Sequence, residues 1–572
     1  MKPRIFFSAL ALVVVALSVI GLGGFWGLTA RNPLSLINQG GQTLPSGTQF
    51  VPKSAPVTVS VLTRPDRLAD LWLFLSTPNR RRQTQAEIER LEKTLLAGTD
   101  LSYEQDIRPW LGDEITFAIT ESDLDQDPEN GRQPGYLTIL SCQDSERAKA
   151  ALELFWQRRA IAGNSLVFEQ FAGSKLIYTK ASTKSSSHSN LASAIVSSRF
   201  VLLANDPKVI QQALTSGQSR DLNLEQDSGY RKAMNSLPDK RVGLVFLNVP
   251  ASLNWLGVAT PNAPSLALSE LGSADGVFDR AVLSLRLNRQ GLLADTALLA
   301  AAGHQFQPQT LASSAPSLAA SRLLPMGSPL VVVGENLNQL WQDLRSNLPY
   351  YTSVLQLSHP LWESLETALG GSPEPLLSWV KGDFALGLTD PSPQSQDWLL
   401  VAQHEAASQV AINDLDALAQ RQGLSVGPLM LGEHPVTAWT RLSVQPNRGR
   451  SGGDTLAVTT QVAGLHTSLG DFDLFSTSPT ALYKAFQSPD SSLDGEKQWQ
   501  QAIAPFSRPN LGYLYLDWPA LEPVLLREIP WLRLVETLGQ PLFNHLQSVA
   551  ITSYGRDQQL QSGAFFLQLS NP

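Results

Sequence analysis

Cysteine is almost absent from this sequence, because Cys142 is the only one among 572 residues. A single cysteine excludes any intramolecular disulfide, so a hydrophobic core has to stabilise the fold without one. Cys142 ends the apolar run "YLTILSC", and the neighbouring sequence offers no base that would activate its thiol. The pattern therefore predicts a small buried residue at the end of a strand.

Charged residues are also scarce, at 16% of the chain, whereas about a quarter is typical of globular domains. The hydrophobic share of 43% is typical of a folded protein and excludes a disordered one. The formal net charge of −8 makes a broad basic face implausible, so we expect no nucleic-acid partner.

Recognisable catalytic and cofactor-binding motifs are missing. The sequence has no GxSxG nucleophile elbow, no GxxxxGK[ST] phosphate loop and no CxxC pair. No two of the seven histidines lie within four residues of each other, and "HEAAS" at His404 has Ser408 where a zinc protease helix needs its second ligand. We therefore predict no catalytic residue and no cofactor.

One acidic loop, "ESDLDQDPENG", resembles a calcium loop in part. Asp123, Asp125 and Asp127 alternate, as oxygen ligands around one Ca²⁺ do. Pro128 stands where an EF-hand needs glycine, however, and Pro134 stands where it needs the bidentate glutamate. The favoured interpretation is a solvated hairpin loop without a metal, and weak calcium binding at the three aspartates is the alternative.

A basic cluster in "NRRRQTQAEIERLEK" comprises Arg80, Arg81 and Arg82. The stretch after it has helical periodicity, so the three arginines would lie at a helix N-terminus, where cations are mildly unfavourable. The favoured interpretation is a solvated turn. The functional alternative is contact with anionic lipid headgroups or with an acidic protein surface.

The N-terminal segment predicts membrane attachment. Residues 5–28 carry no charge and would span a hydrocarbon core of about 30 Å as a helix. Lys2 and Arg4 precede them, so the positive-inside rule places the N-terminus in the cytoplasm and residues 31–572 in the periplasm or thylakoid lumen. A cleaved signal peptide is the alternative, but Leu28 would occupy the −3 position of a cut after Ala30, which is unfavourable.

The remaining chain contains an internal repeat at a spacing of 269 residues. Matched stretches include "RPWLGDEITFAIT" with "LSWVKGDFALGLTD" and "GLVFLNVPASL" with "GYLYLDWPAL". The spacing predicts a membrane anchor at 1–30, a juxtamembrane linker at 31–49, a first copy at 50–301, a linker at 302–322 and a second copy at 323–572. The matched positions are mostly apolar, Gly, Pro or Trp, which indicates a repeated scaffold and not a repeated active site.

Each copy mixes short strands with amphipathic helices. Runs such as "APVTVSVL", "EITFAIT" and "FVLLAN" predict strands, and Asp206 before Pro207 predicts a helix start. Consecutive strands with short links favour antiparallel pairing. The expected fold class is α+β: an N-terminal transmembrane helix followed by two tandem, internally duplicated α+β domains with mainly antiparallel sheets.

The stretches "FVPKSAPVTVSVLTRPDRL", "DIRPWLGDEITFAIT" and "QPGYLTIL" resemble a family of cyanobacterial single-pass membrane proteins that carry a domain of unknown function. The resemblance implies one N-terminal anchor, a large extracytoplasmic part, and the thylakoid or plasma membrane as the location. It brings no catalytic residues.

The expected function is a membrane-anchored extracytoplasmic binding or assembly protein without a catalytic site. The lipid bilayer would contact residues 5–28, and a protein or an anionic lipid would be a further partner. The alternatives are an extracytoplasmic enzyme whose site forms in the cleft between the copies, and a lipid-binding protein.

Overall fold

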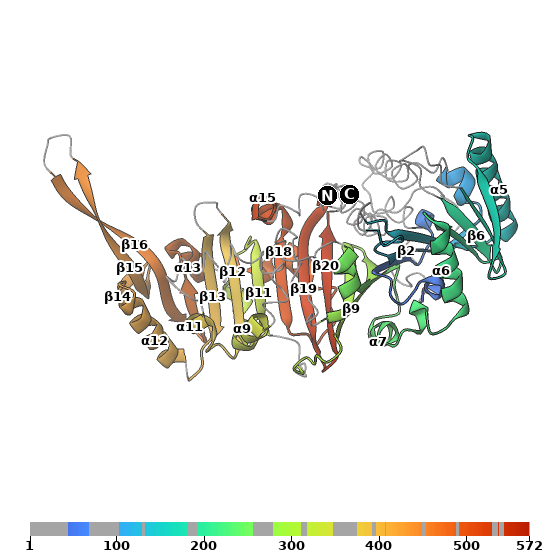
Figure 1. Ribbon diagram of the computed structural model, residues 1–572. Helices are drawn as coiled ribbons and strands as arrows, with labels where there is room; N and C mark the ends of the chain where they lie inside the picture. The colour runs from blue at the N-terminus through green and yellow to red at the C-terminus, as the bar shows by residue number, and fades with distance from the viewer. Residues whose placement is uncertain are drawn as a thin grey trace.

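The computed structural model describes residues 44–67, 102–127, 132–179, 191–255, 278–309, 317–346, 374–391, 396–406, 408–448, 454–487, 491–528, 536 and 543–570. In these residues, twenty strands form one antiparallel sheet, which runs through the whole elongated molecule (Figure 1).

The first ten strands form one half of the sheet, here called the first copy. Their hydrogen-bonded order is β4-β5-β6-β7-β3-β2-β1-β8-β9-β10. Their bounds are β1 (Val57–Val61), β2 (Leu111–Glu121), β3 (Gly135–Cys142), β4 (Leu166–Phe171), β5 (Ser174–Thr179), β6 (Ala192–Val196), β7 (Phe200–Ala204), β8 (Gly243–Asn248), β9 (Phe278–Asn288) and β10 (Gly291–Ala300).

The other ten strands, the second copy, repeat this order as β14-β15-β16-β17-β13-β12-β11-β18-β19-β20. Their bounds are β11 (Leu330–Glu335), β12 (Asp383–Pro391), β13 (Gln396–Gln403), β14 (Ser425–Leu431), β15 (His434–Arg448), β16 (Asp454–Leu469), β17 (Phe472–Ser476), β18 (Gly512–Asp517), β19 (Leu546–Arg556) and β20 (Leu560–Leu569).

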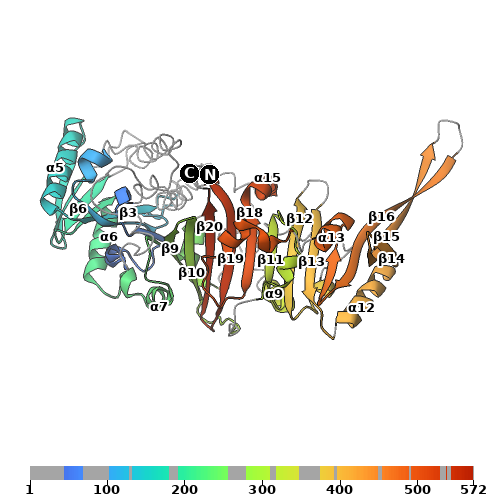
Figure 2. The same cartoon turned by 180° about the vertical axis from the view of Figure 1, so that it is seen from behind.

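Helices and short turns cover both faces of the sheet. Face A carries η1 (Ser46–Phe50), α6 (Pro207–Gln218), η3 (Leu224–Gln226) and α7 (Ser228–Ser236), with η4 (Ala320–Leu323), α13 (Pro479–Phe486), η6 (Leu493–Gly495) and α14 (Lys497–Ile503) in the second copy. Face B carries η2 (Tyr103–Ile107), α5 (Ser145–Ile161) and α8 (Val249–Trp255), with α9 (Leu337–Ser346), α11 (Glu374–Leu377), α12 (Ser408–Arg421) and α15 (Trp518–Glu528) in the second copy. Figure 2 shows the same arrangement from behind.

Strand alternation explains why both faces are apolar. In β10, Leu293 and Ala297 belong to the clusters of face A, whereas Leu292 and Ala294 belong to those of face B. Successive side chains of a strand point to opposite faces, so a strand that is covered on both sides needs apolar residues in both sets.

Predicted helix capping is confirmed at α6. Asp206 is the N-cap residue, its carboxylate accepts a hydrogen bond from the backbone N–H of Lys208, and Pro207 occupies the first turn. The side chain satisfies a backbone donor that the helix leaves unpaired, and proline has no such donor to lose.

The two copies meet through β10 and β20. These strands pair antiparallel over nine residue pairs, from Gly291–Gln568 to Leu299–Leu560. Gly291 has a φ of 155°, and a Cβ atom at this position would lie 1.9 Å from the carbonyl oxygen of Leu567. Only glycine fits this close approach, so the joint between β10 and β20 requires glycine at position 291 as well as two strand-forming segments.

The predicted fold class is therefore wrong. The sequence predicted two separate α+β domains behind a transmembrane helix, whereas the structure has one continuous antiparallel sheet that both copies build. The apolar pattern of a helix-covered strand is the same whether its sheet ends at residue 300 or continues into the other copy. The pattern therefore could not show that the two sheets are joined. In the described residues, no helix is long and apolar enough to cross a membrane, and residues 5–28 lie outside that part of the chain.

Candidate functional site

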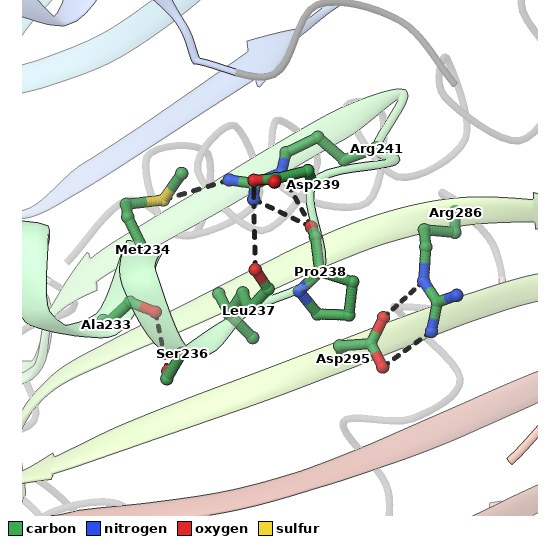
Figure 3. A network of polar contacts seen from close by, with 9 residues as sticks. All are labelled: Ala233, Met234, Ser236, Leu237, Pro238, Asp239, Arg241, Arg286 and Asp295. Carbon is green, nitrogen blue, oxygen red and sulfur yellow. Dashed lines mark hydrogen bonds and ion pairs between the residues drawn. The ribbon is translucent and has the colours of Figure 1, made fainter. Parts of the chain in front are cut away.

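An ion pair with a buried carboxylate lies beside the joint between the copies. Arg286 on β9 donates to both carboxylate oxygens of Asp295 on β10, at 2.6 and 2.9 Å, and Asp295 is only 3% exposed (Figure 3). A two-point contact of this kind fixes geometry as well as charge. The strand register places Tyr554 and Ala564 at these positions in the second copy. The ion pair is thus a property of the first copy.

A second arginine in the same region is completely buried. The guanidinium of Arg241 donates to the carbonyl oxygens of Pro238 at 2.8 Å and Leu237 at 3.4 Å, and it lies 3.4 Å from the sulfur of Met234 (Figure 3). Burial lowers the pKa of Arg241. In the second copy Asn510 donates to the carbonyl oxygen of Ser507 in the same way. Both side chains hold the loop before a central strand, which is a structural role.

A hydrogen-bonded chain of three side chains lies on face B of the second copy. The hydroxyl of Ser468 on β16 donates to Asp473 on β17 at 2.7 Å, and Nδ1 of His404, just after β13, lies 2.9 Å from the other carboxylate oxygen. The Asp473 side chain has no exposed surface, while that of His404 is 45% exposed. The buried carboxylate of Asp473 therefore fixes the orientation of the partly exposed imidazole of His404.

The first copy fills the equivalent positions with apolar residues. The strand register relates His404 to Cys142, Asp473 to Val201 and Ser468 to Ile195. The backbone N–H groups of Cys142 and His404 also donate to equivalent carbonyl oxygens, both at 2.8 Å. All three first-copy residues belong to one hydrophobic cluster. The same scaffold therefore carries a packed apolar set in one copy and a Ser–Asp–His chain in the other.

The order of the hydrogen bonds among Ser468, Asp473 and His404 limits the chemistry that these side chains can perform. In a nucleophilic triad the imidazole contacts the serine hydroxyl and takes its proton. Here the Ser468 hydroxyl is bonded to the carboxylate of Asp473, so the imidazole of His404 does not activate it. What remains is an oriented, partly exposed imidazole that can contact a ligand.

A related pair lies two residues away on β16. Nε2 of His466 is 2.9 Å from Asp416 of α12, and the indole N–H of Trp439 donates to the same carboxylate oxygen at 2.7 Å. His466 is buried and lies against the rings of Trp439 and Phe475. This network ties α12 to the sheet, so it stabilises packing.

The aspartates of the possible calcium loop shape a turn. Asp123 accepts a hydrogen bond from the backbone N–H of Gln133 at 3.2 Å, and Asp125 accepts one from that of Asp127 at 3.3 Å. Within the described residues, no three His, Cys, Asp or Glu side chains are grouped so that they could hold a metal ion. Arg80, Arg81 and Arg82 lie outside the described residues.

Cys142 is half-buried at the end of β3, where the sequence predicted a strand end. Burial raises the pKa of its thiol to about 11, so the unreactive form dominates at neutral pH. Sequence reasoning missed the Ser468–Asp473–His404 chain, because His404 lies 69 residues before Asp473 and only the sheet brings it to the β16–β17 hairpin that holds Ser468 and Asp473.

The second copy also carries a projecting arm. Strand β14 accompanies β15 only as far as Thr440, and β17 accompanies β16 only from Leu465. Beyond these points, β15 and β16 continue to pair with each other up to Arg448 and Asp454. Figure 1 shows this two-stranded arm extending past the end of the sheet. In the described residues its outer strand edges have no hydrogen-bonded neighbour, so they can accept another strand.

Comparisons with known proteins add little about activity. No curated protein matches the chain. The structures titled crystal form I and crystal form IV of TP0453 each align at 9% identity with a TM-score of 0.24, covering 46% and 44% of this chain and 82% and 79% of theirs. A likeness this weak supports no inference about fold or function. Residues 10–569 match a family described as "Protein of unknown function (DUF3352)", and the chain belongs to that family.

Proposed function

We propose that this protein is a binding or assembly protein and not an enzyme, held at a membrane by its uncharged segment 5–28 and presenting its sheet on the non-cytoplasmic side. The membrane location rests on the sequence, namely that segment and the basic residues before it. The binding role rests on the projecting arm of β15 and β16.

The arm supports binding because, in the described residues beyond Arg441 and Gln461, its two strands pair only with each other. An isolated two-stranded hairpin is at best marginally stable in water, and its open edges favour pairing with foreign strands. Proteins often recognise extended segments by adding a strand to such an edge, where backbone hydrogen bonds supply affinity. In the described residues the counterpart strand β5 is 6 residues long, against 15 for β15.

Crosslinking in intact cells tests this proposal. The full-length chain carries a C-terminal tag, and captured species are identified by mass spectrometry. In a trimmed variant, Asn-Gly replaces residues 442–460, which joins the cross-strand partners Arg441 and Gln461 through a two-residue hairpin turn. The matched control is Thr460→Ser, a conservative change within the arm.

We expect the wild type and the control to capture the same protein partner, and the trimmed variant to lose it at equal abundance. Capture of that partner by the trimmed variant at an unchanged yield would show that the arm is not the binding element. If no variant captures any partner while deletion of the protein changes a metabolite pool, the enzyme alternative replaces the proposal.

A further inference from the structure

The sheet has two open ends in the described residues. Strand β4 pairs with β5 alone, and β14 pairs with β15 alone. Both terminal strands expose large apolar side chains: Phe168 on β4 is 60% exposed, and Met430 and Leu429 on β14 are 62% and 39% exposed. Exposed edge strands with apolar side chains are templates for pairing with another chain.

The charges around the two ends are complementary. From α5 to β5, residues 145–179 contain five cationic side chains and three acidic ones. From α12 to the part of β15 beside β14, residues 408–440 contain one cationic side chain and three acidic ones. A basic end that meets an acidic end is favoured over either end meeting its own kind.

Strand direction also fits a contact between unlike ends. Every pairing in the sheet is antiparallel, and twenty is an even number, so the two terminal strands β4 and β14 run in opposite directions. A molecule placed in line with the first therefore sets its β4 antiparallel to the neighbour's β14, and the alternation continues. The chain already contains such a joint, because β10 and β20 connect two copies of the scaffold over nine residue pairs.

From these observations we propose that β4 of one molecule pairs with β14 of the next, so that the protein assembles end to end into linear oligomers. This deepens the assembly role proposed above, on which it rests, by naming a second copy of the chain as a partner. Pro428 lies within β14 and has no N–H to donate, which keeps the joint weaker than the internal one. Contacts between unlike surfaces do not close on themselves, so growth is open-ended and depends on concentration.

Sedimentation velocity of the full-length chain in mild detergent tests the assembly. We expect dimers, trimers and longer species to appear as the protein concentration rises, and to dissociate at about 1 M salt, where charge attraction is screened. Phe168→Lys blocks the β4 end and Met430→Lys blocks the β14 end. Met326→Lys is the matched control, because Met326 is 47% exposed on the loop before β11, away from both terminal strands.

We expect each blocked variant to stay monomeric alone, while an equal mixture of the two forms dimers and nothing longer. Each variant keeps the end that the other needs, so only a joint between unlike ends gives this result. Dimers of Met430→Lys alone would show pairing of β4 with β4 and overturn the proposal, as would a wild type that remains monomeric throughout. Neither result affects capture of a different protein by the β15–β16 arm, so the two proposals fail separately.

Discussion

Asp295 is paired across the central joint with Ala564, the residue that stands 269 positions later in the second copy. A residue can lie opposite its own counterpart only where a two-fold axis relates the strands. The two copies are therefore arranged about a pseudo-two-fold axis that passes between β10 and β20. The side chains break this symmetry, because Asp295 forms an ion pair with Arg286 and Ala564 cannot.

Replacing Asp295 with alanine is expected to destabilise the joint. The change leaves the guanidinium of Arg286 without its carboxylate in a mostly covered position, which costs about 2–3 kcal/mol, less than for a fully buried pair because Arg286 is 27% exposed. Chemical denaturation would measure this loss. The control Asp113→Asn, an exposed carboxylate on β2, should change stability by less than about 0.5 kcal/mol.

The double variant Arg286→Met, Asp295→Leu removes both charges together. It should recover most of the lost stability, since apolar replacements of a buried pair are often neutral. A double variant as unstable as Asp295→Ala would mean that packing at Asp295, and not the unpaired charge, causes the loss.

The thiol of Cys142 should react slowly while the protein is folded. Burial raises its pKa to about 11, so only about one thiol in a thousand is ionised at pH 8. A colourimetric disulfide reagent should label the native protein at least about tenfold more slowly than the same protein in denaturant, where the pKa returns to about 8.5. Equal labelling rates in the two states would contradict the buried position at the end of β3.

Much of the scaffold follows from sequence patterns, because apolar alternation and spacing are local signals. The 269-residue spacing that relates Trp110 to Trp379 also relates the strands β8 and β18. One match was misleading. The Gly-Asp pairs of the two copies look equivalent in sequence, but the strand register of β2 and β12 makes Asp383 the structural counterpart of Glu114. Similar residues can therefore be matched by eye even when they occupy different positions in the paired strands.

The joint and the polar chain could not be predicted. Alternation shows that Gly291–Ala300 forms a strand, but it does not identify the neighbour on the open side, so the strand β20 was not expected there. Ser468 and Asp473 share the β16–β17 hairpin, but His404 comes from a segment 69 residues before Asp473, and nothing local marks it as their partner. Long-range pairing decides both features.

Substitutions in the Ser468–Asp473–His404 chain test whether these polar side chains stabilise the fold. Asp473→Ala alone should cost about 3 kcal/mol, because it leaves the hydroxyl and imidazole without their buried acceptor and opens a cavity. The triple variant Ser468→Ile, Asp473→Val, His404→Cys installs the residues of the first copy. It should be at least as stable as the wild type in thermal unfolding, because these three residues pack together on the equivalent strands of the first copy.

A stable triple variant that no longer supports cell growth or partner capture would show that the second copy retains the polar chain for function. If the triple variant is instead less stable than Asp473→Ala, the two copies differ in backbone around these strands, and the equivalence drawn from the register is wrong.

Stability should also depend on pH through Asp517, the last residue of β18. Burial raises the pKa of Asp517, although its carboxylate accepts a hydrogen bond from the backbone N–H of Ala520. A carboxyl group whose pKa is higher in the folded state binds its proton more tightly there. The protein therefore loses stability from this group as the pH rises from about 4 through the raised pKa, and the loss is complete above it.

The first copy offers a matched pair of variants, because Asn248 occupies the equivalent position and accepts the same hydrogen bond from Ala251. Asp517→Asn keeps the acceptor and removes the charge, so it should raise Tm by about 1–2 °C at pH 7 and have little effect near pH 3, where the wild-type carboxyl is neutral. Asn248→Asp should lower Tm at pH 7 for the same reason. If Asp517→Asn lowers Tm at pH 7, attraction of the carboxylate to the start of α15 outweighs the cost of burying it.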